Sequence, residues 1–129
     1  MTSNTTKWDN FSPEERKKLL VKLFKAVDAM RAIDASMPTQ TFATLLAIAL
    51  EEGQSINQIG TRIGISQSSA SRNVSVLSDW DWKKKVGLKL VEYQQDRMNL
   101  SVKSIHLTKQ GKQLVEHLIF IMKGADKNP

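Results

Sequence analysis

The sequence predicts a mainly α-helical fold with one small β-hairpin, in the order four helices, hairpin, helix. Apolar residues recur at helical spacing in five segments, and four of these open with a serine or threonine that can cap a helix. The segments LKLVEY and LSVKSIHL are instead rich in branched residues and flank the polar stretch QQDRMN. That arrangement is typical of two strands joined by a turn.

Composition indicates one globular domain. The chain has 129 residues, of which 40% are hydrophobic and 25% are charged. It contains no cysteine, so disulfides and thiolate metal sites are excluded. The N-terminus lacks the apolar run of a secretory signal, and apolar runs such as residues 118–122 are far too short to span a bilayer. We therefore expect a cytoplasmic protein with no membrane partner.

Local signals mark where the first helices begin. Ser12 and Glu15 have the spacing of a capping box, with Pro13 at the first helical position. Ser55 and Gln58 repeat the box at the third helix. In the second helix, from Thr39 to Gly53, the expected buried stripe is Phe42, Leu45, Leu46, Ala49 and Leu50.

These signals predict the organisation of the chain. Residues 1–11 are expected to form a flexible arm, 12–124 a single domain and 125–129 a frayed tail. Within the domain, the candidate elements are dimerisation helices over 12–34 and 108–124, a helix-turn-helix over 55–78 and a hairpin wing over 88–107.

Residues 55–78 carry the most specific motif, two short helices joined by a glycine-centred turn. Gly64 can adopt the left-handed backbone conformation of a sharp turn, and Ser66 can cap the second helix. Gly60 is small where the second helix must cross close by. Asn73 stands on the flank of the inner face, where an aliphatic residue is usual. The apolar residues that would lock the two helices at an angle are Ile59, Ile63, Ile65, Ala70 and Val74.

The second helix of this pair, 66–78, is unusually rich in serine on its outer side. Short hydroxyls would let the helix lie deep in a DNA major groove, whereas Gln67 and Arg72 are long enough to read a base. Ser66 and Gln67 lie at the helix start, where free backbone N–H groups favour a phosphate. The alternative to DNA contact is that these serines are only solvated or only cap the helix. The residues expected to face outward are Ser68, Ser71, Arg72 and Ser75.

The net charge of +6 lies in one part of the chain. Residues 1–53 hold seven basic and seven acidic side chains, 113–129 hold two of each, and 54–112 hold ten basic and four acidic. A basic excess over the helix pair and hairpin favours a polyanionic partner. Arg97 at the hairpin tip is the candidate for the flanking minor groove. Candidate phosphate contacts, each with solvated surface charge as its alternative, are Lys83, Lys84, Lys85, Lys89 and Lys103.

The order of elements, the phrase ISQSSASRNVSVL, and Asp96–Arg97 followed by HLTKQG resemble the MarR family of winged-helix regulators. The resemblance covers about residues 38–118. It implies that the serine-rich helix enters the major groove and that the hairpin is the wing. It also implies a homodimer on palindromic double-stranded DNA, often released by a small phenolic or anionic effector. Release by cysteine oxidation is excluded because cysteine is absent.

The last helix is more apolar than a surface helix needs, because one stripe of roughly 100° would cover a core. The excess predicts contact with a partner chain as well as with the core. The alternative to a partner chain is that the first and last helices of one chain cover each other. The expected dimer-interface residues are Leu19, Leu20, Leu23, Phe24, Leu118, Ile119, Phe120 and Met122.

The leading hypothesis is a dimeric, sequence-specific transcriptional regulator, cytoplasmic and associated with DNA. Two alternatives stay open: a DNA-binding protein with little sequence preference, in replication, packaging or architecture, and a protein-interaction winged helix that never contacts DNA. We expect no enzyme and no cofactor, since no catalytic triad or glycine-rich phosphate loop can be argued. His106 and His117 are isolated from any acid-rich ligand set, so no metal site is expected.

Overall fold

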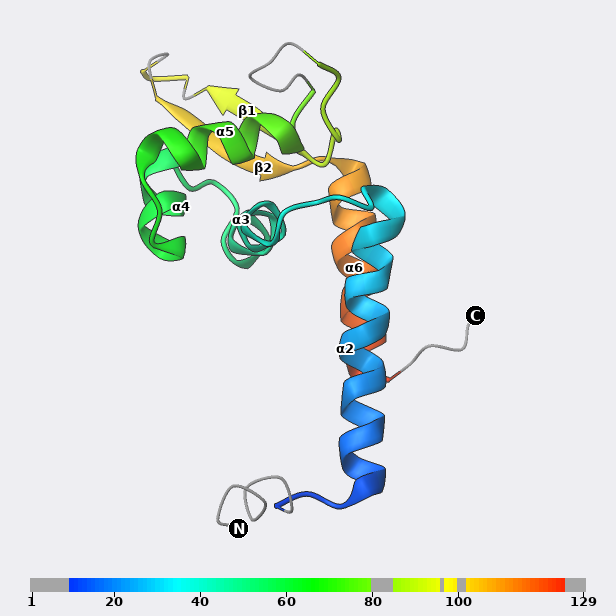
Figure 1. Ribbon diagram of the computed structural model, residues 1–129. Coiled ribbons are helices and arrows are strands. Elements are labelled where there is room, and N and C mark those ends of the chain that lie inside the picture. Colours follow the sequence, from blue (N-terminus) through cyan, green and yellow to red (C-terminus); the bar gives the residue numbers. More distant parts are fainter. Residues whose placement is uncertain (1–9, 80–84, 96, 100–101, 125–129) are drawn as a thin grey trace.

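The computed structural model describes residues 10–79, 85–95, 97–99 and 102–124. Over these residues it confirms the predicted fold class: five helices and one two-stranded antiparallel hairpin, in the predicted order. Figure 1 shows a head, made of α3, α4, α5 and the hairpin, at one end of a long stalk formed by α2 and α6. The elements are α2 (Pro13–Ile33), α3 (Thr39–Leu50), α4 (Ile56–Ile63), α5 (Gln67–Leu77), β1 (Val91–Gln95), β2 (Lys103–Leu107) and α6 (Lys109–Lys123).

The predicted helix caps are confirmed. Ser12 and Ser55 each form a capping box, in which the serine hydroxyl accepts from the backbone N–H three residues later. Thr108 Oγ1 accepts from Gly111 N at 3.0 Å and caps α6. Each cap satisfies one of the N–H groups that a helix start leaves without a carbonyl partner. The caps therefore fix where the helices begin.

The buried face of α3 differs from the predicted stripe. Leu45 and Ile48 are buried, but Leu46 and Leu50 are exposed, and two threonines take their place in the core. The threonine hydroxyls are satisfied: Thr44 donates to Gln40 O at 2.8 Å, and Thr41 donates to a side chain of α5. The prediction is confirmed for Phe42, Leu45 and Ala49, which are buried or packed against the core, and it is wrong for Leu46 and Leu50. Apolar periodicity missed the threonines because a hydrogen-bonded hydroxyl loses little on burial.

The hairpin strands begin later than predicted. Residues 88–90 pair with the end of α5 instead: Leu88 N donates to Val76 O at 2.9 Å, and Leu90 N donates to Leu77 O at 2.8 Å. Lys89 between them has φ 60°, a left-handed conformation that a strand cannot contain. β1 therefore starts at Val91, paired with Leu107.

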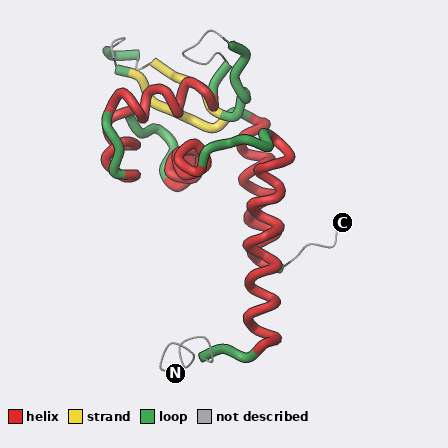
Figure 2. The backbone as a smooth tube through the Cα atoms, viewed as in Figure 1, coloured by secondary structure: helices red, strands yellow, loops and turns green. Residues whose placement is uncertain are grey.

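The stalk packs α2 against α6, with Ala26 and Met30 of α2 buried in the same core as three α6 side chains, Leu114, Leu118 and Ile121. Figure 2 shows the two helices side by side over the length of α6. The expectation that Leu118 lies in a dimer interface is corrected here. It is only 6% exposed, because its spacing from Leu114 and Ile121 puts it on the inward face of α6.

Two properties of the described helices and side chains bear on function. No helix in the described ranges has the length and apolar character needed to cross a membrane. Among the same residues, no three His, Asp or Glu side chains gather closely enough to hold a metal ion.

The first turn of α6 lies against the chain just before β1, and Gly111 makes this possible. A Cβ at Gly111 would overlap the carbonyl oxygen of Leu90. We expect Gly111→Ala to lower the free energy of unfolding by about 1–3 kcal/mol, since backbone cannot move aside as a flexible side chain can. Thermal unfolding measures this. The neighbouring exposed change Gln110→Ala should stay within about 0.5 kcal/mol of the wild type, and an equally stable Gly111→Ala protein would contradict the prediction.

Candidate nucleic-acid interface

The turn between α4 and α5 is as sharp as the sequence requires. Gly64 has φ 83°, and its N–H donates to Gly60 O at 2.8 Å. A Cβ on Gly60 would lie 3.1 Å from Ile65 O and 3.4 Å from the Ala70 Cβ. Gly60 therefore lets α5 cross α4 closely, as predicted, and the pair forms a helix-turn-helix.

The start of α5 explains part of its serine content. Ser66 Oγ accepts from Ser69 N at 3.1 Å, so Ser66 is the N-cap. Its hydroxyl also lies 3.2 Å from Ser68 Oγ and 3.1 Å from Ser69 Oγ. These hydroxyls form a local polar network at the helix start. Capping accounts for Ser66, but it does not account for the serines further along.

The outer side of α5 is polar and free of carboxylates over Gln67–Leu77. Ala70, Val74 and Leu77 are fully buried against the head core, as predicted. We call the exposed residues opposite them the α5 face. Its members are Gln67, Ser68, Ser71 and Arg72.

The chain leading into the hairpin is bonded to the end of α5, and in Figure 1 β1 runs away from the stalk while β2 returns toward it. Ile105 is fully buried and pairs with Tyr93, which anchors the hairpin to the head. Lys103 Nζ lies 5.6 Å from the centre of the Tyr93 ring, within cation–π range. Arg97 is exposed in the connection between the strands. The wing thus carries two exposed cationic side chains, Arg97 and Lys103.

The predicted contact residues are placed as follows. Gln67, Ser68, Ser71, Arg72, Lys85, Lys89, Arg97 and Lys103 are exposed, Ser66 is exposed and caps α5, and Ser75 is half-buried. Lys83 and Lys84 lie outside the described residues, as does Asp96.

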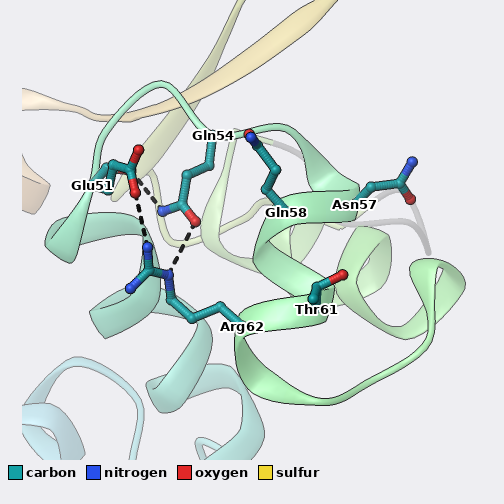
Figure 3. A pocket seen from close by; sticks show the side chains of 6 residues that line it. All are labelled: Glu51, Gln54, Asn57, Gln58, Thr61 and Arg62. Atoms are coloured by element: carbon teal, nitrogen blue, oxygen red, sulfur yellow. Dashed lines mark hydrogen bonds and ion pairs between the residues drawn. The ribbon is translucent and has the colours of Figure 1, made fainter.

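A junction that the sequence analysis missed ties the helix pair to the wing. Gln54 is 3% exposed, and its Nε2 donates to Ala47 O at 2.8 Å and to Glu51 O at 2.6 Å. Its Oε1 accepts from Arg62 Nε at 3.2 Å, and Arg62 also pairs with the Glu51 carboxylate at 2.8 Å. Figure 3 shows these side chains converging at the wall of a surface recess. Since these polar groups satisfy one another, we interpret the recess as a structural junction.

Residues 52–54, between α3 and α4, also form hydrogen bonds with β2. Gly53 N donates to Ile105 O at 2.8 Å, and Ile105 N donates to Gln54 O at 2.9 Å. Glu52 Oε1 accepts from Leu107 N at 2.8 Å. The wing is therefore held by hydrogen bonds to the segment that leads into α4. No local sequence signal marks these pairs, because the partners are about fifty residues apart.

The stalk exposes a large apolar surface. Phe24 is 66% exposed, and its neighbours on α2 and the outer residues of α6 are about half exposed. Monomeric proteins rarely leave so many large side chains together in water. We call this surface the stalk face. Its members, all predicted for a dimer interface, are Leu19, Leu20, Leu23, Phe24, Ile119, Phe120 and Met122.

The helix-turn-helix and its adjoining hairpin define the chain as a winged helix-turn-helix protein. Within that class, residues 35–82 match the model of the MarR family. This part of the chain is similar to the MarR family, as the sequence resemblance indicated. No curated protein sequence matches it.

Solved structures of the same fold cover most of the chain. RV1404 from Mycobacterium tuberculosis aligns over 98% of this chain and 78% of its own, with 17% identity and a TM-score of 0.64. MepR from S. aureus, solved as a complex with DNA, aligns over 88% and 80%, with 20% identity and a TM-score of 0.58. MarR aligns over 89% and 79%, with 15% identity and a TM-score of 0.55. At these identities the likeness shows the fold.

Tyr93 offers a direct test of how the wing packs, because it is the only tyrosine in the chain. Partial burial raises the pKa of the Tyr93 hydroxyl above its ordinary value of 10.0. An absorbance titration of the phenolate should therefore have its midpoint above 10.0 in the folded protein and near it in denaturant. Because the unfolded chain loses this proton first, stability should fall as pH rises through that range. Tyr93→Phe should remove both effects, and a folded midpoint at or below the denatured one would contradict the packing described.

Proposed function

We propose that the chain is a dimeric, sequence-specific transcriptional regulator that binds double-stranded DNA, with α5 in the major groove and the wing on the flanking backbone or minor groove. The observation that carries the proposal is the α5 face. It is exposed, it lacks carboxylates, and it lies in the segment of the chain that holds the whole charge excess.

The chemistry of the α5 face suits a groove. An α-helix fits the major groove, and serine hydroxyls are short enough to let its backbone approach the bases. Gln67 can read adenine through its amide, and Arg72 can read guanine through its guanidinium fork. Arg97, Lys85 and Lys89 are exposed where the wing would meet phosphates. The similarity in fold to MepR, which was solved as a complex with DNA, supports DNA binding.

One rival function has a specific observation in its favour. Apart from Gln67 and Arg72 the α5 face carries only serines, which suits binding with little sequence preference. A winged helix that binds only proteins is less favoured, since it would not need the local positive charge. We expect no catalytic activity, and we infer a cytoplasmic, DNA-associated location from the same chemistry. A small-molecule effector remains a prediction from the family resemblance.

Selection from a random duplex library separates the two DNA-binding functions. A regulator should bind its selected site about 10³-fold or more tightly than random duplex at the same salt concentration. Fluorescence anisotropy at two salt concentrations measures both affinities. Equal affinity for all duplexes would reject the regulator in favour of the low-preference function, and no binding in dilute buffer would reject both.

Two substitutions should change DNA binding in different ways, one in sequence preference and the other in general affinity. Gln67→Ala should relax preference at one base pair of the selected site, at a cost of about 1–3 kcal/mol for that base, because a base-reading hydrogen bond is lost. Lys89→Gln should weaken binding to every duplex and reduce the slope of log K against log salt by about 1, because one phosphate contact is lost. The assignment of roles fails if Gln67→Ala weakens all duplexes equally.

The stalk face supports the dimeric part of the proposal. Burying exposed apolar area stabilises association by about 25 cal/mol per Å² before the costs of association are subtracted. α2 and α6 together offer seven large apolar side chains on one stalk. A second copy would bury them and would place two heads on successive turns of DNA.

A charge placed in the stalk face should separate the subunits. Phe24→Glu should give a monomer in sedimentation velocity at micromolar concentration, because an unpaired carboxylate would be buried between chains. Gln110→Glu adds the same charge to the exposed first turn of α6, away from the stalk-face residues, and should remain dimeric. A wild-type protein that sediments as a monomer would refute the dimer itself.

A further inference from the structure

Asn73 is the polar residue on α5 that stands where an apolar contact was expected, and the structure shows what it does. Its Oδ1 accepts from the Thr41 hydroxyl at 2.7 Å, and its Nδ2 donates to Gln40 Oε1 at 2.9 Å. The same Nδ2 donates to Ser69 O at 2.9 Å. Two of these hydrogen bonds fasten α5 to the first residues of α3, and the third lies within α5. We call the three bonds together the Asn73 latch.

The latch fixes the orientation of the Gln40 amide. Thr41 is only 2% exposed, so its hydroxyl proton needs a buried acceptor and holds Asn73 Oδ1 in that role. The two protons of Asn73 Nδ2 then go to Ser69 O and Gln40 Oε1. Because the Gln40 oxygen is the acceptor, its Nε2 group points away from the latch with two donor protons. Within the described residues these protons have no hydrogen-bond partner, and Gln40 is exposed.

Gln40 lies at the border of the α5 face. Its latch partners, Ser69 and Asn73, directly follow Ser68 and Arg72 of that face in the sequence. α3 packs directly against α5, and Figure 1 shows it end-on beneath that helix. A long neutral side chain that presents only donors matches a phosphate oxygen, which only accepts.

We propose that Gln40 is a further DNA contact residue, donating from Nε2 to a phosphate oxygen beside the groove that holds α5, and that Asn73 is the residue that positions it. The proposal deepens the DNA-binding function above and rests on it. It adds a contact from α3, outside the helix-turn-helix and the wing. It also assigns Asn73 a positioning role that an aliphatic residue could not fill.

The first experiment measures the contact. Gln40→Ala should bind both the selected site and random duplex about tenfold more weakly, as expected for a lost hydrogen bond to a charged acceptor. The slope of log K against log salt should not change, because a neutral amide displaces no counterion. Lys89→Gln is the matched comparison that lowers the slope, and Gln110→Ala is an exposed glutamine control that should bind like the wild type. Wild-type affinity for Gln40→Ala, or a loss confined to one sequence, would overturn the contact.

The second experiment measures the positioning. The pair Thr41→Val with Asn73→Leu replaces both buried partners by apolar groups of similar shape, so the fold should be kept and can be checked by thermal unfolding. This variant should lose the same roughly tenfold in affinity, and adding Gln40→Ala to it should cost nothing more. Losses that multiply would show that Asn73 does not act through Gln40.

The two proposals fail in different ways. If the wild type binds duplex DNA and Gln40→Ala binds equally well, the Gln40 contact is wrong and the regulator proposal stands. If the wild type binds no duplex at any salt concentration, the regulator proposal is wrong and the contact falls with it.

Discussion

The buried amide of Gln54 is the interaction on which the arrangement of the head depends. It closes the end of α3 by donating to the Ala47 and Glu51 carbonyls, and it accepts from Arg62 of α4. Its backbone carbonyl also accepts from Ile105 of the wing. One residue thus connects the scaffold helix, the first helix of the helix-turn-helix and the hairpin. An unsatisfied amide at this depth would cost about 1–3 kcal/mol, so all of these partners must be in place together.

The polar and the apolar exposed surfaces lie on different parts of the molecule. The head holds the polar, cationic surface and the hydrogen bonds that aim it, whereas the stalk holds apolar side chains with little to cover them within one chain. Figure 2 shows how far the stalk extends from the head. Because the two surfaces lie on different elements, changes in the stalk face should alter assembly without reshaping the α5 face.

Much of the fold could be predicted from short stretches of adjacent residues. Ser12, Ser55 and Ser66 were predicted as caps and are caps, Thr108 caps α6 at the start of its predicted range, and Gly64 adopts the left-handed turn. These predictions succeeded because each depends on a few adjacent residues. The inner face of α5 was likewise given by its apolar spacing.

The features that the sequence could not reveal depend on distant partners. The buried face of α3 contains threonines because their hydroxyls find acceptors, and Leu118 is buried because α2 covers it. β1 starts late because residues 88–90 pair with the end of α5. At the candidate interface, the exposed serines and Arg72 could be predicted from helical geometry. Gln54 and Gln40 could not, since their roles come from partners elsewhere in the fold.

The glycine at the root of α6 has a mechanical consequence. At Gly111 the stalk helix meets the carbonyl of Leu90, with no side chain between the two backbones. Leu90 is in turn hydrogen-bonded to the last residue of α5 and accepts from Thr108 N. No flexible side chain lies between the two backbones to accommodate a rotation of α6. Such a rotation would therefore move Leu90 and, through its hydrogen bond, the end of α5. In the proposed dimer, this close contact would limit how far each head can rotate relative to its stalk.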